Sequence, residues 1–187
     1  MGIGAGMIVE GYAAIFERPY FLKWNQGIQE WEIIDRNAFK YCDMTKTVFL
    51  FGHAGGPLAT VEAGTLLLDV DWYGLHFRAD LQATQAGRRL YSDIHDGLID
   101  KASFAFRRNK HADQVTDTGS KKLEKTITTR VNEILSLEDV SAVNRPANKE
   151  ACVYADSGLF GAKVKRELER MQERARQRER IRILASL

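Results

Sequence analysis

Along most of the chain, apolar residues come in short runs that alternate with polar ones, which predicts β-strands rather than long helices. The strands are expected at 7–16, 28–34, 47–51, 58–61, 65–70, 74–81, 102–106, 123–134, 137–143 and 151–155. Gly11, at the centre of the first run, predicts a bulge or bend there. The turn residues Gly55 to Pro57 predict a break, and the polar residues 110–122 predict a mobile loop.

Two segments have helical spacing instead. In the first, 84–96, Leu90 and Ile94 form the apolar face, and Gly97 suits the position just after the helix. The second is the tail 162–187, which consists of strong helix formers without Gly or Pro. Four apolar residues at 4-3-4 spacing form one short stripe on the tail: Val164, Leu168, Met171 and Ala175.

Many short strands, one embedded helix and a terminal helix predict a fold that is mainly β with α (α+β). The expected architecture is a small antiparallel β-barrel of about six or seven strands with the embedded helix and a C-terminal helix. The 187 residues suffice for one such core but not for two. We therefore expect a barrel domain over residues 1–160 and a basic helical tail over residues 161–187.

Charge distinguishes the tail from the rest of the chain. Residues 162–187 carry nine Lys/Arg and four Glu, which gives a net charge of +5. The whole chain has a net charge of +2, so residues 1–161 carry a net charge of −3. The tail is interpreted as a solvated helix on the end of the domain, as a helix for a partner or a second copy, or as a nucleic-acid arm. It holds no aromatic residue for base stacking, so we expect no nucleic-acid partner.

Composition disfavours several other classes of protein. Hydrophobic residues make up 44% of the chain, which is too many for intrinsic disorder. No apolar run approaches the ~20 residues of a membrane helix, and residues 1–7 lack the features of a secretory signal. Cys42 and Cys152 are far apart and form no metal-binding pair. We therefore expect a cytoplasmic protein with no membrane partner, no metal and no cofactor.

Two residues are the first candidates for chemistry. His53 leaves the apolar run 47–51 and precedes a Gly-rich turn, which is a suitable place for a cleft. Ser103 is the lone hydroxyl in the apolar segment 102–106, so it needs a hydrogen-bond partner if it is buried. A backbone carbonyl would make Ser103 structural, whereas an adjacent histidine would make it a nucleophile. From the residues alone, a structural His53 is about as good an interpretation as a functional one.

An acidic pair and a short loop follow later in the chain. Glu138 and Asp139 lie in an apolar segment, so each needs solvent or a partner. If Asp139 faces a cleft, it can orient an imidazole and stabilise its protonated form. Glu138 is the alternative acid, although strand alternation points the two side chains to opposite faces. Arg145 lies in the tight loop 144–148, whose N–H groups or guanidinium could face an oxyanion.

Four segments in this order resemble the prohead (capsid-maturation) protease family of tailed bacteriophages, distant relatives of the herpesvirus assemblins. They are 11–16, 48–58 with His53, 96–106 with Ser103, and 137–148, in which V-S-x-V precedes P-A-N. The resemblance runs from about Val9 to Val153. Three positions depart from the family pattern. Ala54 stands where an acid is common, Ala105 where a Gly is common, and Arg145 where an aromatic residue is common.

The resemblance implies a serine endopeptidase with Ser103 as nucleophile, His53 as base and Asp139 as the third member. It implies cleavage of the scaffolding region of the major capsid protein, or of a separate scaffold protein, and of the protease itself, with a possible dimer. The setting it implies is the assembling procapsid in the host cytoplasm. Two alternatives stay open: a catalytically inactive capsid-assembly protein on the same fold, and a nucleic-acid-binding barrel.

Overall fold

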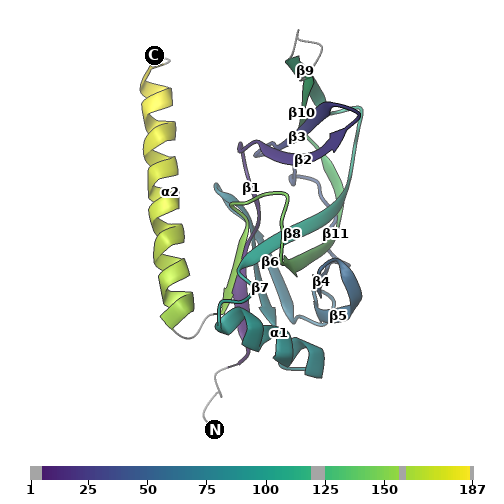
Figure 1. Cartoon of the computed structure of the whole chain (residues 1–187), viewed down its shortest axis with the longest axis vertical. Coiled ribbons are helices and arrows are strands. Elements are labelled where there is room, and N and C mark those ends of the chain that lie inside the picture. Colours follow the sequence, from purple (N-terminus) through teal and green to yellow (C-terminus); the bar gives the residue numbers. More distant parts are fainter. Residues whose placement is uncertain (1–5, 119–124, 156–158, 186–187) are drawn as a thin grey trace.

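The computed structural model describes residues 6–118, 125–155 and 159–185, which form two β-sheets and two helices (Figure 1). The larger sheet has eight strands in the order β5-β4-β11-β8-β12-β1-β7-β6 and curls into a nearly closed barrel. Its strands are β1 (Ile8–Ile15), β4 (Val48–Phe51), β5 (Ala54–Thr60), β6 (Leu66–Val70), β7 (Gly74–Asp80), β8 (Lys101–Arg108), β11 (Ile134–Val143) and β12 (Cys152–Ala155). The two helices are α1 (Gln85–His95) and α2 (Leu159–Ala185).

A smaller sheet of four strands lies at one end of the barrel, at the top of Figure 1. Its order is β2 (Tyr20–Asn25), β3 (Ile28–Ile34), β10 (Lys125–Val131) and β9 (Gln114–Thr118). The predicted α+β class is confirmed, but the prediction of six or seven barrel strands is wrong, because the barrel sheet has eight. Most strand pairs are antiparallel as expected, yet β4 with β11 and β3 with β10 are parallel.

Two local predictions were wrong, and one strand was missed. Residues 55–57 do not break the chain but lie within β5, and 114–118, expected as loop, form β9. β2 was not predicted at all. Residues 119–124, which belong to the predicted loop and to the predicted strand 123–134, lie outside the described residues. β5 contains Gly and Pro residues near its start and β9 is mostly polar, so their strand structure comes from pairing with the neighbouring strands β4 and β10, which periodicity does not report. β2 is rich in apolar residues and pairs with β3 as a hairpin.

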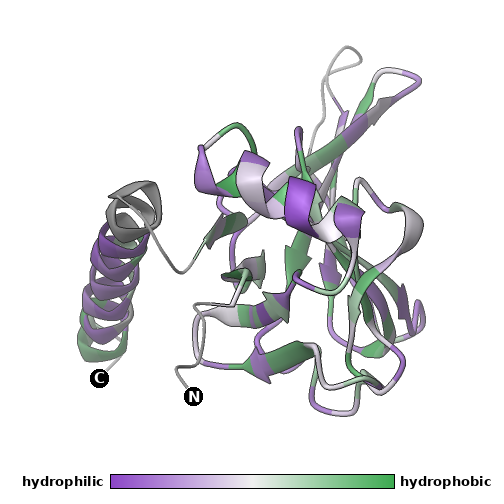
Figure 2. Cartoon of the chain, turned by 90° about the horizontal axis from the view of Figure 1, so that it is seen from below, coloured by the Kyte–Doolittle hydropathy of each residue, from purple (hydrophilic) through white to green (hydrophobic). Residues whose placement is uncertain are grey.

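Helix α1 covers the other end of the barrel, as the end-on view in Figure 2 shows. Thr84 caps its N-terminus, with Oγ1 accepting a 2.9 Å hydrogen bond from the backbone N–H of Gly87. At its C-terminus Gly97 has φ +75°, and the N–H of Leu98 bonds the carbonyl of Asp93, which closes a Schellman motif. The predicted apolar face is confirmed, because Leu90 and Ile94 are buried in the barrel core with Phe49 and Phe77 among others.

Gly11 is needed in β1 for close approach rather than for a bend. A Cβ at this position would lie 1.9 Å from the carbonyl oxygen of Cys152 on the neighbouring strand β12. The irregularity in β1 occurs just afterwards, between Tyr12 and Ala14 in the pairing with β7. The prediction of an irregularity in this strand was therefore correct, but the glycine is required because the backbones of β1 and β12 pack closely.

The basic tail forms helix α2, which runs alongside the barrel (Figure 1). Leu168 is buried, and Ala175 packs against the same small cluster of aromatic and aliphatic side chains on β1, on β12 and in the turn before β7: Tyr12, Ile15, Tyr73 and Tyr154. The amide of Gln172 donates to the Tyr12 hydroxyl at 3.0 Å, and the guanidinium of Arg176 stacks 4.8 Å from the ring centre of Trp72. The described part of the chain contains no helix that is long and apolar enough to cross a membrane.

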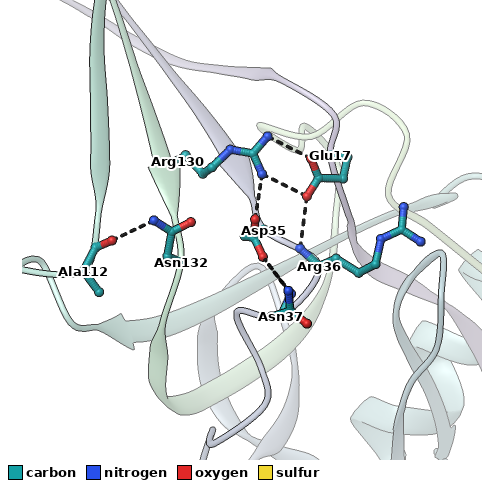
Figure 3. Close-up of polar contacts among 7 residues, drawn as sticks. All are labelled: Glu17, Asp35, Arg36, Asn37, Ala112, Arg130 and Asn132. Atoms are coloured by element: carbon teal, nitrogen blue, oxygen red, sulfur yellow. Dashed lines mark hydrogen bonds and ion pairs between the residues drawn. The ribbon is translucent and has the colours of Figure 1, made fainter. Parts of the chain in front are cut away.

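A polar cluster joins the small sheet to the barrel (Figure 3). Arg130 on β10 makes two hydrogen bonds of 2.9 and 2.8 Å to the carboxylate of Glu17, which follows β1, and a third of 2.8 Å to Asp35. The backbone N–H of Arg36 also donates to Glu17, at 3.2 Å. Nearby, the amide of Asn132 donates to the carbonyl of Ala112 at 2.7 Å. The hydrogen bonds from Arg130 are the main cause of a lowered pKa at Glu17, against an opposing effect of burial.

This cluster makes stability depend on pH. A carboxyl whose pKa is lowered by folding contributes stability above its ordinary pKa, 4.5 for Glu17, and loses that contribution as the pH falls through the lower folded value. We expect Arg130→Met to reduce the free energy of unfolding by about 1–2 kcal/mol at pH 7. The wild-type chain should lose more stability than this variant between pH 7 and roughly pH 3. Urea unfolding at both pH values measures the difference.

Lys125→Met is the matched control, because Lys125 lies on the same strand but pairs with Asp117 at the exposed surface. Its effect at pH 7 should stay within about 0.5 kcal/mol. Equal losses of unfolding free energy in the two variants would contradict this account of the cluster. So would an equal fall in stability with pH in the wild type and in Arg130→Met.

Candidate active site

The parallel pairing of β4 with β11 determines where His53 lies. Val48 pairs with Asp139 and Phe51 with Ala142, so the two strands run side by side toward the same end. The N–H of Gly52 then bonds the carbonyl of Ala142 at 2.9 Å, and the chain turns back into β5. His53 lies in this turn with φ +58°, a left-handed conformation that is rare outside glycine and costs free energy. The turn therefore directs the imidazole back toward β11.

His53 and Asp139 are in direct contact. The Nδ1 atom of His53 lies 2.7 Å from Oδ1 of Asp139. Because a carboxylate can only accept, this contact assigns a proton to Nδ1, and in the neutral form of the ring Nε2 is then the hydrogen-bond acceptor. The Asp139 side chain is only 10% exposed, whereas that of His53 is 36% exposed. The ring thus lies between a buried carboxylate and the surface.

Ser103 lies on the strand that neighbours β11 on its other side. In the antiparallel pair β8 and β11, Ser103 is directly opposite Ser141, and Ala105 is opposite Asp139. Residues opposite each other point to the same face, and so do residues two apart on one strand. Ser103 therefore shares a face with Asp139 and Ser141. It is half-buried, and its hydroxyl makes no hydrogen bond to another described residue. Among the described residues, no hydrogen bond joins Ser103 to His53.

Ser141 is a functional candidate that the sequence analysis missed. Its side chain is fully buried, and its hydroxyl donates to Oδ1 of Asp139 at 2.7 Å while accepting the backbone N–H of His53 at 3.2 Å. The V-S-x-V motif at 140–143 was the available signal, because Ser141 follows Asp139 at the two-residue spacing that shares a strand face.

The two acids of β11 have different surroundings. Glu138 is exposed, and its carboxylate accepts a 2.7 Å hydrogen bond from Ser136. The register of β11 against β8 shifts between Leu137 and Asp139, so Glu138 is the extra residue of a bulge. Asp139, and not Glu138, contacts the histidine. This geometry favours Asp139 as the acid of the site.

Arg145 lies away from these contacts. It is exposed and lines a groove between the loop after β11 and the small sheet, together with Phe21, Trp24, Trp31 and Lys149 among others. Among the described residues, no hydrogen bond or ion pair links Arg145 to His53, Ser103 or Asp139.

A buried carboxylate, a histidine whose second nitrogen is free, and a serine on the same strand face are the parts of a serine-hydrolase site. The comparisons agree with this class. The model of the caudovirus prohead serine protease family matches residues 3–173, so the chain belongs to that family. The resemblance expected from the sequence is thereby confirmed. At the level of its family, the chain is a capsid-maturation protease that functions inside the assembling procapsid. No curated protein and no solved structure matches the chain significantly.

Proposed function

We propose that this chain is a catalytically active serine endopeptidase in which Ser103 is the nucleophile, His53 the general base and Asp139 the orienting acid. The observation that carries the proposal is the 2.7 Å contact between His53 Nδ1 and Asp139. By the register of β8 against β11, Asp139 lies on the same face of the sheet as Ser103. Membership of a serine protease family supports the reaction class.

The reaction follows from the protonation state of the ring. His53 Nε2 accepts the proton of Ser103 as Oγ bonds to the carbonyl carbon of a peptide, giving a tetrahedral oxyanion. Asp139 holds the ring by its Nδ1–H and stabilises the imidazolium. The C–N bond then breaks, and His53 returns the proton to the leaving amine. Water activated by His53 hydrolyses the acyl-enzyme and regenerates Ser103.

The geometry also favours Ser103 over its opposite neighbour as the nucleophile. Ser141 is fully buried, and its hydroxyl already donates a hydrogen bond to Asp139. Ser103 is half-buried, and its hydroxyl donates to no other residue that the structure describes. A nucleophile must reach a substrate carbonyl and release its proton to the histidine, and the partial exposure of Ser103 suits this role better than the full burial of Ser141.

Substrates are proposed from the family and from the sheet edge next to the site. β5 is the last strand of the barrel sheet, and its first four residues, which begin directly after His53, are exposed. An extended peptide can pair with such an edge and present its backbone to the catalytic residues. We propose that it comes from the scaffolding region of the capsid protein or a separate scaffold protein, and from a second copy of this chain. The tail at 161–187 is proposed as a separate unit from the protease barrel, 1–160.

A serine-directed fluorophosphonate tests the proposal, because it reacts only with an activated serine. We expect one adduct per chain, located on Ser103 by peptide mass spectrometry. His53→Ala should lower the labelling rate by about 10⁴-fold or more, to background, because the hydroxyl then lacks its base. His76→Ala is the control, since His76 lies on β7 and contacts Tyr12 rather than the site.

Two results would contradict the proposal. The absence of any adduct on the folded chain would support the inactive capsid-assembly alternative. An adduct on Ser141 would mean that the roles of the two serines are reversed.

A further inference from the structure

We propose that Ser141 is a positioning residue that holds both His53 and Asp139 in their working geometry. This inference rests on the proposed function and adds a fourth residue to its site. The hydroxyl of Ser141 contacts both residues at once, 2.7 Å from the Asp139 carboxylate and 3.2 Å from the backbone nitrogen of His53. It does not touch the reacting atoms and therefore acts through its two neighbours.

The first contact orients the acid. Oδ1 of Asp139 accepts from both the Ser141 hydroxyl and His53 Nδ1. Two donors on one oxygen hold the carboxylate against rotation, and hydrogen bonds to a charged acceptor are stronger than neutral ones. Without Ser141, the carboxylate could turn away from the ring, and the imidazolium formed in the reaction would lose part of its stabilisation.

The second contact orients the base. His53 has φ +58°, a backbone conformation that persists only where the surroundings hold it. The acceptor for its N–H is Ser141, at a position where β11 is paired on both sides, with Leu50 of β4 and with Ser103 of β8. A rigid central strand thus anchors the turn that carries the imidazole. The same hydroxyl can make both bonds because it has one proton to donate and two lone pairs.

Ser141→Ala tests the inference, with Ser136→Ala as the matched control. Like Ser141, Ser136 donates a 2.7 Å hydrogen bond to an acid two residues away on β11, but that acid, Glu138, is exposed and, within the described part of the chain, makes no hydrogen bond to His53. The rate of fluorophosphonate labelling is measured at several probe concentrations. This gives the limiting labelling rate and the probe concentration at which half of that rate is reached. We expect Ser141→Ala to lower the limiting rate roughly 10- to 100-fold, with the half-saturating concentration within about twofold. Ser136→Ala should match the wild type.

Two further measurements separate positioning from a general loss of structure. Ser141→Cys keeps nearly the same volume with a weaker donor, so its limiting rate should fall between those of the wild type and Ser141→Ala. The proton between His53 Nδ1 and Asp139 should give a low-field NMR signal that weakens or moves in Ser141→Ala but not in Ser136→Ala. A rate loss that merely follows the unfolded fraction would overturn the inference, as would an unchanged rate in folded Ser141→Ala.

The result for Ser103→Ala distinguishes failure of the Ser141 inference from failure of the proposed function. If Ser103→Ala abolishes labelling while Ser141→Ala labels normally, the inference fails and the proposed function stands. If Ser103→Ala still labels at the wild-type rate, the proposed function itself fails.

Discussion

Alanine at position 103 is expected to lower peptide-bond cleavage by about 10⁴–10⁶-fold, which is the cost of removing the nucleophile from a catalytic unit of this kind. The imidazole of His53 would remain bound to Asp139, but it would have no hydroxyl to deprotonate. The measurement is cleavage of the two proposed substrates, the purified chain itself and a co-assembled capsid protein, followed by gel electrophoresis and mass spectrometry. We expect full-length protein to accumulate in the variant.

Ser136→Ala is the control for this experiment, since it removes a hydroxyl from the same sheet at a site bound to the exposed Glu138. It should cleave at the wild-type rate. Ser103 is only half-buried, so its loss should change the free energy of unfolding by no more than about 1 kcal/mol. Undiminished cleavage by a folded Ser103→Ala chain would exclude the nucleophile assignment.

The second large effect is expected at the acid. Asp139→Asn should reduce cleavage by about 10³–10⁴-fold with little change in substrate affinity. An amide can donate to Nδ1, which would place the ring proton on Nε2 and leave no base facing Ser103. Oδ1 of Asp139 also accepts a hydrogen bond from the Ser141 hydroxyl, so the change to an amide disturbs a second hydrogen bond as well. Turnover and KM, measured separately on a cleaved peptide, test this expectation.

Glu138→Gln is the neighbouring control, because Glu138 is exposed and bonded to Ser136 rather than to His53. It should leave turnover within about twofold of the wild type. If Glu138→Gln were impaired and Asp139→Asn were active, the two acids would have exchanged roles and the bulge in β11 would open in the working enzyme.

Local structure was predictable wherever it depends on nearby residues. The helix at 84–96 was visible from the spacing of Leu90 and Ile94 and from Gly97, because caps and apolar faces arise within a few residues. The strands that line the barrel core were visible from apolar runs. β9 was not visible, because its strand structure depends on pairing with β10 and its own residues are polar.

The parts of the candidate site were also predictable as chemistry. His53 after a core strand, Ser103 in an apolar segment and Asp139 in another were each singled out by residue type and context. Ser141 was missed because a serine in a strand has no chemical signature until its neighbours are known. Its importance comes from the two hydrogen bonds that its buried hydroxyl makes.

The sequence by itself therefore determined the secondary structure of the clearly periodic segments, the α+β class, the basic tail and the candidate residues proposed for acyl-transfer chemistry. Only the tertiary structure decided that β4 lies parallel to β11, that Glu138 bulges out of register, and that Ser103 is opposite Ser141. The physical reason is that strand pairing joins residues far apart in the chain. A shift of one residue in such a pairing would turn Asp139 away from the histidine, and no local pattern encodes that choice.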